Sequence, residues 1–181
     1  QNTQNTGGIS TDGVDLSVQY SKQTPIGTFH ADLEGTLITQ YRLQEYTGGP
    51  VLNLVGWFNS GNLPAVRWTH DLTINWTSPG RMWGAGVTNR FLSSYIDQHD
   101  EPYPGFGGPQ VQRIVGADST WDIFASYKPI NSLTVLFGIQ NVLNTDPPFS
   151  NQTVNWPSGY NPVYSSPLLR TFYLNLKYQF L

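Results

Sequence analysis

Cysteine is missing from this 181-residue sequence, and its absence excludes disulfides, cysteine metal sites and thiol catalysis. Charge is also scarce, because charged residues make up 12% of the chain against roughly a quarter in ordinary soluble domains. The net charge of -3 gives no electrostatic reason to expect nucleic acid as a partner. No stretch approaches the ~20 apolar residues of a membrane-spanning helix. A chain that is polar without being charged is suited to a β-sheet with one face toward water and the other face apolar.

Catalytic motifs are missing as well. The sequence contains no G-x-S-x-G, no P-loop and no H-E-x-x-H motif. Its three histidines, His30, His70 and His99, are too scattered to suggest a shared metal ion. We therefore expect neither an enzyme nor a resident cofactor.

Period-two alternation of apolar and polar residues dominates the chain, whereas helical periodicity is hard to find. The alternation predicts an all-β, antiparallel fold of seven strands, at about 13–22, 28–43, 65–77, 82–96, 118–128, 132–143 and 169–181. The last segment, LRTFYLNLKYQFL, is the clearest, because one of its faces carries only Phe172, Leu174, Leu176, Tyr178 and Phe180. Each predicted strand thus has one apolar and one polar face.

Charged side chains in the strand centres fall on the face opposite the apolar one. Those predicted to line a wet interior are Asp32, Glu34, Arg67, Asp71, Arg90, Asp122 and Lys177. Four residues break the pattern: His70 and Asn89 have apolar parity, Arg170 has it at a strand end, and Phe124 lies on a polar face. A register slip of one residue would bring the charges to the apolar side, so the alternation specifies what each face must contact.

The connections between these strands alternate between short and long. Tight turns rich in Pro, Gly and Asn are expected at 23–27, 77–81 and 128–131, and long connections at about 44–64, 97–117 and 144–168. This asymmetry is typical of outer-membrane β-barrels, as are aromatic residues near strand ends, here Trp68, Trp76, Trp83, Trp121, Tyr127 and Tyr178. A soluble antiparallel sandwich would show the same alternation. The low charge, the loop asymmetry and the final strand favour a transmembrane barrel segment.

Residues 132–181 carry several motifs in a fixed order. SLTVLFGIQNVLNTDPPFSNQ contains Asn141-Val142-Leu143-Asn144 and then Pro147-Pro148, and GYNPVYSSPLLRTFYLNLKYQF contains Gly159, Tyr160, Asn161, Pro162 and Tyr164 before Arg170, Phe172 and Tyr173. This order resembles the C-terminal end of TonB-dependent outer-membrane receptors, and STDGVDLSVQY near the start is similar to strands that recur in their barrels. One departure is that the family usually finishes on an aromatic residue, whereas here Leu181 follows Phe180.

The resemblance implies that residues 1–181 are the C-terminal portion of a larger barrel of about 22 strands, whose plug domain and earlier strands are not in this chain. The last strand would then close the barrel, and QNTQNTGG would be the tail of an extracellular loop. The implied function is active transport in the outer membrane of a Gram-negative bacterium: a receptor binds a scarce extracellular ligand and imports it with energy from the TonB complex, which acts through the plug.

The implied partners are membrane lipid, the rest of the barrel with its plug, the TonB complex, and a small-molecule, oligosaccharide or peptide ligand. An iron–siderophore, an oligosaccharide, a peptide and cobalamin all remain open as ligands. Two other classes of protein also remain, a soluble carbohydrate-binding β-sandwich and a passive porin.

Ligand recognition is expected in the long connections, where aromatic rings stand beside small polar groups. The candidate rings, for which packing between loops is the alternative, are Trp57, Phe58, Tyr103, Phe106, Trp156, Tyr160 and Tyr164. The segment DQHDE is a weak candidate for a cation site, through Asp97, His99, Asp100 and Glu101. A solvated acidic loop is the favoured interpretation of that segment.

Overall fold

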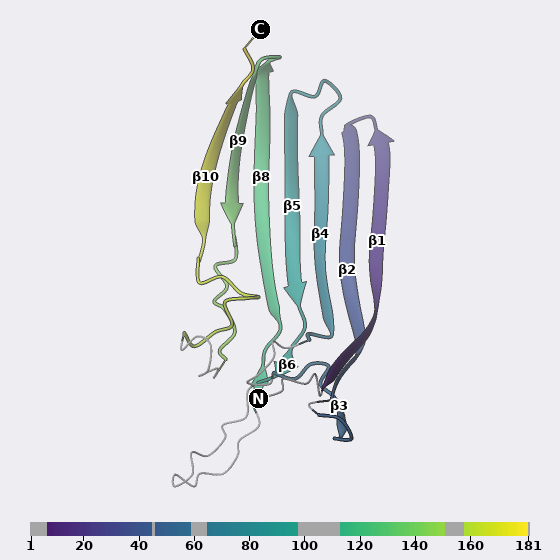
Figure 1. Cartoon of the computed structure of the whole chain (residues 1–181). Coiled ribbons are helices and arrows are strands. Elements are labelled where there is room, and N and C mark those ends of the chain that lie inside the picture. The colour runs from purple at the N-terminus through teal and green to yellow at the C-terminus, as the bar shows by residue number, and fades with distance from the viewer. Residues whose placement is uncertain (1–6, 45, 59–64, 98–112, 151–157, 181) are drawn as a thin grey trace.

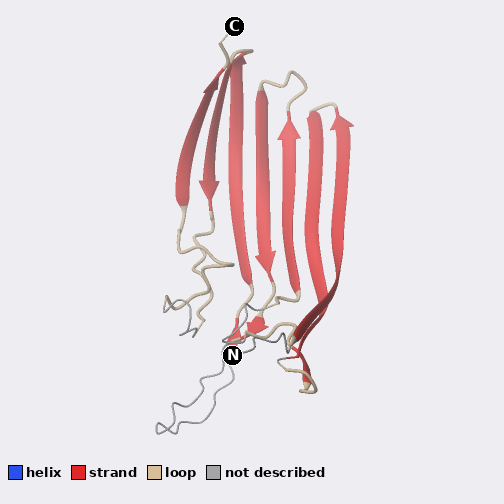
Figure 2. Cartoon of the chain, in the orientation of Figure 1, coloured by secondary structure: helices blue, strands red, loops and turns tan. Residues whose placement is uncertain are grey.

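The computed structural model describes residues 7–44, 46–58, 65–97, 113–150 and 158–180. Within these ranges the chain is built from strands and loops (Figure 2). The described residues contain no helix that is long and apolar enough to cross a membrane. The strands are β1 (Gly8–Thr24), β2 (Gly27–Gln44), β3 (Val51–Asn53), β4 (Trp68–Thr77), β5 (Trp83–Leu92), β6 (Tyr95–Ile96), β7 (Ile114–Val115), β8 (Asp118–Ile130), β9 (Leu133–Gln140) and β10 (Thr171–Tyr178).

Seven of these strands form one antiparallel sheet in the order β1-β2-β4-β5-β8-β9-β10, and β3 pairs with β2. Neighbours in the sheet are also neighbours along the chain, so the sheet is a meander. Figure 1 shows a single curved layer, with the tight turns and the C-terminus at one end and the long connections, β3 and β6 at the other. The predicted seven antiparallel strands are confirmed, and so is the segregation of short and long connections.

The strand bounds differ from the expected ones mainly at the long-connection end. β1 begins at Gly8 because its pairing with β2 continues through an irregularity at Asp12/Gly13. The expected strand 82–96 ends at Leu92, where Ser93 bonds to the Trp68 backbone through its own N–H and its hydroxyl. The chain then leaves the sheet, and Tyr95–Ile96 pairs with β7 in a separate two-stranded sheet.

The cross-strand register places the predicted apolar faces on one side of the sheet. Residues directly opposite one another in neighbouring strands share a face. One such row crosses six strands, through Ala31, Ile74, Val87, Ile123, Ile139 and Phe172. Among the described residues no protein covers this side: Ile74 and Ile123 in central strands expose 40% and 38% of their surface, and Phe172 in the edge strand β10 exposes 61%. A soluble sandwich would cover them with a second layer, and the described residues form no such layer.

Aromatic side chains lie near both ends of this apolar face. Trp76, Trp83 and Tyr127 are at the turn end, where the rings of Trp83 and Tyr127 stack with centroids 4.2 Å apart. Trp68 and Trp121 are toward the long-connection end. The span of β4 from Trp68 to Trp76 is about 26 Å at the usual rise of a strand. At the ~35–45° tilt of strands in transmembrane barrels, this length covers roughly 20 Å of height, somewhat less than the ~25 Å apolar band of those barrels.

The buried hydrophobic core lies at the long-connection end of the sheet. One cluster in it consists of Phe58, Val66, Leu92, Tyr95 and Val115. They come from the connections on either side of β4 and β5 and from the end of β5. Because these side chains bury one another, the core holds the long connections against the end of the sheet.

Candidate functional site

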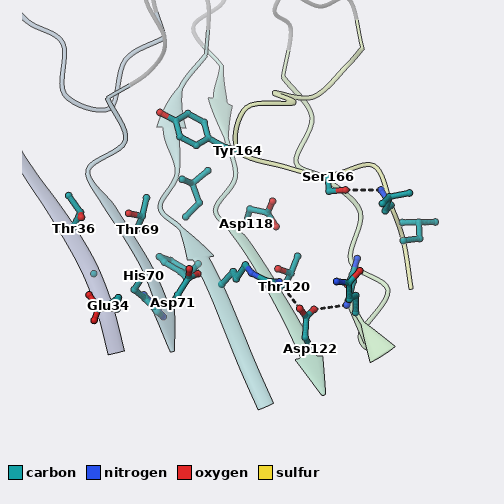
Figure 3. Close-up of a pocket in the computed structure, with 18 of the residues that line it drawn as sticks. Glu34, Thr36, Thr69, His70, Asp71, Asp118, Thr120, Asp122, Tyr164 and Ser166 are labelled. Atoms are coloured by element: carbon teal, nitrogen blue, oxygen red, sulfur yellow. Dashed lines mark hydrogen bonds and ion pairs between the residues drawn. The ribbon is translucent and has the colours of Figure 1, made fainter. Parts of the chain in front are cut away.

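A cavity of about 870 Å³ lies on the polar face of the sheet, toward the long-connection end (Figure 3). Strands β2, β4, β5 and β8 supply most of its wall. The connection between β9 and β10 supplies Tyr164, Ser166, Leu168 and Leu169. The cavity is therefore the place where the polar face meets a long connection.

Carboxylates dominate the charged groups of this cavity. The acidic residues among its lining are Asp15, Glu34, Asp71, Asp118 and Asp122. Arg90 is the only arginine or lysine that the described lining contains, and His70 also lines the cavity. Glu34 stands directly opposite Asp71, and Asp71 stands opposite Arg90 on the next strand. Like charges at directly opposed positions are destabilising, so this row of the sheet is suited to water or to a complementary partner.

Three of these carboxylates accept a hydrogen bond from a serine or threonine hydroxyl group. The donors are Ser17 to Glu34, Thr36 to Asp15 and Ser165 to Asp118, each at 2.7 Å. The last of these bonds ties the β9–β10 connection to the wall of the cavity at β8. Tyr164 comes from the same connection, and burial, followed by the nearby Tyr41, raises the pKa of its hydroxyl.

Asp122 joins the cavity wall to the end of β9. One of its oxygens pairs with the Arg90 guanidinium at 2.6 Å, and the other accepts the Asn141 backbone N–H at 2.8 Å. Asn141 and Asn144 have positive φ angles of 49° and 56°, which asparagine tolerates better than most residues. Asn144 Oδ1 accepts the Arg170 backbone N–H at 3.0 Å. The N-V-L-N motif thus ends β9 and fixes the chain that leads into β10.

The two polar exceptions on the apolar face bond to each other. Trp68 Nε1 donates to His70 Nδ1 at 2.9 Å, and His70 Nε2 lies 3.2 Å from Asn89 Oδ1. Because Nδ1 accepts a hydrogen bond from the Trp68 indole N–H and so carries no hydrogen itself, Nε2 carries the ring hydrogen and donates to Asn89 Oδ1. Asn89 Nδ2 then donates to Ser119 Oγ at 3.0 Å and to the Thr120 carbonyl at 3.1 Å. Every polar side-chain atom of His70 and Asn89 is therefore satisfied.

The aromatic exception on the polar face has a different explanation. Phe124 lies over Gly86 of β5, where a Cβ atom would meet its ring. Tyr173 lies in the same way over Gly138 of β9. A ring placed over a glycine on the neighbouring strand covers backbone that a side chain would otherwise cover.

The loop aromatics predicted to bind ligand lie in different surroundings. Phe58 is only 3% exposed and belongs to the buried core, so its ring is unavailable to a ligand in this structure. Trp57 forms a backbone bridge with Ile96 and is partly exposed, as is Tyr160. Tyr164 lines the cavity. Tyr103, Phe106 and Trp156 lie outside the described residues.

The charged residues predicted to face the interior lie mostly on the polar face, which is opposite the exposed apolar row. Asp32, Glu34, Asp71, Arg90, Asp122 and Lys177 have this placement. Arg67 precedes the first residue of β4 and is exposed. Phe172, Leu174, Leu176 and Tyr178 lie on the apolar face of β10, and the exposed Phe180 follows the end of that strand.

The weak cation candidate is divided by the limits of the described chain. His99, Asp100 and Glu101 lie outside it. Asp97 is 1% exposed and accepts the Ser150 hydroxyl at 2.7 Å, so the interpretation as a solvated acid is wrong for this residue. The described residues contain no group of three side chains that could hold a metal ion.

Several residues that line the cavity were not predicted for the site, and among them are Asp15, Asp118 and Asn141. Asp15 falls on the polar face of its strand, and Asn141 begins the N-V-L-N motif, so the sequence contained an indication that each could belong to the site. Asp118 stands at the first position of β8, where alternation gives no information about a cavity.

No protein-family model and no curated protein sequence matches the chain. Among solved structures, it is similar to the FrpB iron transporter from Neisseria meningitidis (F3-3 variant), with a TM-score of 0.63 and 17% sequence identity. The match covers 97% of this chain and 24% of the transporter chain, so the chain spans well under two thirds of its neighbour's length. This likeness concerns the fold, and it confirms the predicted segment of an antiparallel β-barrel. The total of about 22 strands stays a prediction.

Proposed function

We propose that this chain forms part of the wall of an outer-membrane receptor that imports a scarce extracellular ligand with TonB-coupled energy. The observation that carries the proposal is the register of the sheet, which collects the apolar side chains on one uncovered face and the carboxylates on the other. A closed barrel satisfies its backbone hydrogen bonds between strands, so this curved sheet can stand in lipid once further strands pair with its edges at β1 and β10.

The polar face and its cavity suit the interior of such a barrel. Asp71 and Glu34 would contact lumen water or the plug domain. The ligand would bind at the long connections, where the side chains of Trp57, Tyr160 and Tyr164 are partly accessible to solvent. The TonB complex would act on the plug, and the remaining strands would pair with the edges of β1 and β10.

A test of the location comes first. Fractionation of the bacterium is expected to place the intact protein in the outer membrane and to require detergent for its release. Recovery as a freely soluble periplasmic or cytoplasmic protein would contradict the proposal and revive the soluble binding module.

A second test separates active import from passive diffusion. Uptake of the ligand by cells that carry the intact receptor is expected to stop when the proton gradient is collapsed, because TonB-coupled import needs that energy. Uptake that persists without the gradient would identify a passive porin. Surface binding of ligand should survive the same treatment, which controls for loss of the protein.

A further inference from the structure

A second polar cluster lies among the long connections, apart from the cavity. Tyr95 and Asp97 follow β5, whereas Ser150 and Asn161 belong to the connection between β9 and β10. All four residues are between 1% and 3% exposed. The Ser150 hydroxyl donates to Asp97 Oδ1 at 2.7 Å, so the cluster joins two connections whose bonded residues are 53 positions apart in the sequence.

Two polar atoms of this cluster lack a hydrogen-bond partner, Tyr95 Oη and Asn161 Nδ2. Buried polar groups in native proteins nearly always have one. The Asn161 amide cannot simply be turned around, because its Oδ1 accepts the Val163 backbone N–H at 3.0 Å. Nδ2 is therefore a buried donor that needs an acceptor.

The four side chains share one environment. Burial raises the pKa of the Tyr95 hydroxyl, and the neighbouring Asn161 and Ser150 side chains oppose that rise. The charge of Asp97 also acts on Tyr95 and raises its pKa further. Asn161 and Ser150 approach the tyrosine oxygen closely enough to lower the pKa of its hydroxyl, but neither has the geometry of a direct hydrogen bond to it. The groups are thus neighbours without being direct partners.

We propose that a single trapped water molecule occupies this cluster and completes the hydrogen bonds of Tyr95 and Asn161. A water molecule can accept from the Asn161 amide and from the Tyr95 hydroxyl while donating to the Asp97 carboxylate. A cation would be repelled by the N–H groups of Asn161, and an anion would be repelled by Asp97. Water is the common small species that both donates and accepts.

The trapped water would make the two connections move as one unit. Ser150 and Asp97 supply one direct bond between them, and the water adds a second bridge through Tyr95 and Asn161. This role depends on the loop structure alone and not on the importer function, so the two can fail independently.

A crystal structure of the intact protein at a resolution that shows ordered water provides the direct test. We expect one density peak within about 2.7–3.2 Å of both Tyr95 Oη and Asn161 Nδ2. A direct hydrogen bond between these two residues with no peak would overturn the proposal. A peak with metal-ligand distances to Asp97 would overturn it as well.

A variant gives a second readout in solution. Tyr95→Phe removes one partner of the water, and we expect faster amide hydrogen exchange in both connections, near residues 93–97 and 158–165. If no water is present, the variant only removes an unpartnered buried hydroxyl, and exchange will be unchanged or slower. Tyr46→Phe is the matched control, because Tyr46 is 56% exposed and its hydroxyl has access to solvent. Exchange in the two connections should not respond to that control.

Discussion

On the apolar face, His70 and Asn89 stand in a chain of hydrogen bonds that runs from Trp68 to Ser119 and leaves no polar atom of either side chain unsatisfied. On the polar face, Glu34 stands directly opposite Asp71, and the Glu34 carboxylate is met by a serine hydroxyl instead of a cation. Strand β4 takes part in both arrangements, through His70 on one face and Asp71 on the other. The difference supports the proposed placement, in which the polar face meets water and the apolar face meets lipid, because opposed carboxylates repel each other less strongly beside water.

The largest expected difference between the faces comes from a charge placed on either side of one strand. Leu174→Arg puts a guanidinium on the exposed apolar face of β10, and we expect it to destabilise the intact protein in lipid by up to ~2–4 kcal/mol, the cost of a lipid-facing arginine at the bilayer midplane. Asn175→Arg, at the next position on the polar face, should have a small effect. Denaturant unfolding in lipid vesicles measures both. Equal costs would show that the two faces contact the same medium.

Breaking the hydrogen-bond chain on the apolar face should have a somewhat smaller effect. Asn89→Leu leaves the His70 Nε2–H without an acceptor, which costs ~1–3 kcal/mol for a buried group. His70→Leu leaves Asn89 Oδ1 and the Trp68 indole N–H unpaired.

The double variant His70→Leu/Asn89→Leu removes both members of that pair. We expect it to cost clearly less than the sum of the single variants, because neither partner is then left alone. Additive costs in the double-mutant cycle would mean that the two residues do not interact.

The aromatic rings on the polar face provide a more moderate test. Gly138→Ala would push the Tyr173 ring off its position over the strand, at a cost of about 0.5–1.5 kcal/mol for a strained rotamer. In a Tyr173→Ala background the same substitution should be neutral or stabilising, because alanine orders the strand better than glycine. Thermal unfolding of the four proteins decides the matter. An equal cost in both backgrounds would rule out the ring as the cause.

The smallest expected effect concerns the ion pair of the cavity wall. Arg90→Gln removes the partner of Asp122, and a partly exposed pair of this kind contributes about 0–1 kcal/mol. The loss should shrink further at high salt. Lys177→Gln is the control, since within the described residues Lys177 forms no ion pair. A large loss for Arg90→Gln that does not depend on salt would mean that the wall is drier than proposed.

The sequence was sufficient for the strands and their faces, and less so for the site. Alternation predicted the row from Ala31 to Phe172 because side chains in a strand point to opposite faces with a period of two. It could not show that Phe58 is buried and Tyr164 lines a cavity, since loop positions follow no such period. In the sequence, His70 and Asn89 are two separate exceptions to the alternation. Their hydrogen bond could not be predicted, because it depends on which strands are adjacent and in what register.

The amino-acid sequence by itself determined the all-β class, the antiparallel meander with its short and long connections, and the assignment of each strand's two faces. Those features are local, and period-two patterning and turn residues encode them. Only the tertiary structure decided that Asp97 is buried against Ser150, that Glu34 faces Asp71, and that the β9–β10 connection reaches Asp118 across the cavity. These contacts join residues far apart in the chain, and their geometry is set by strand register and by how the loops pack.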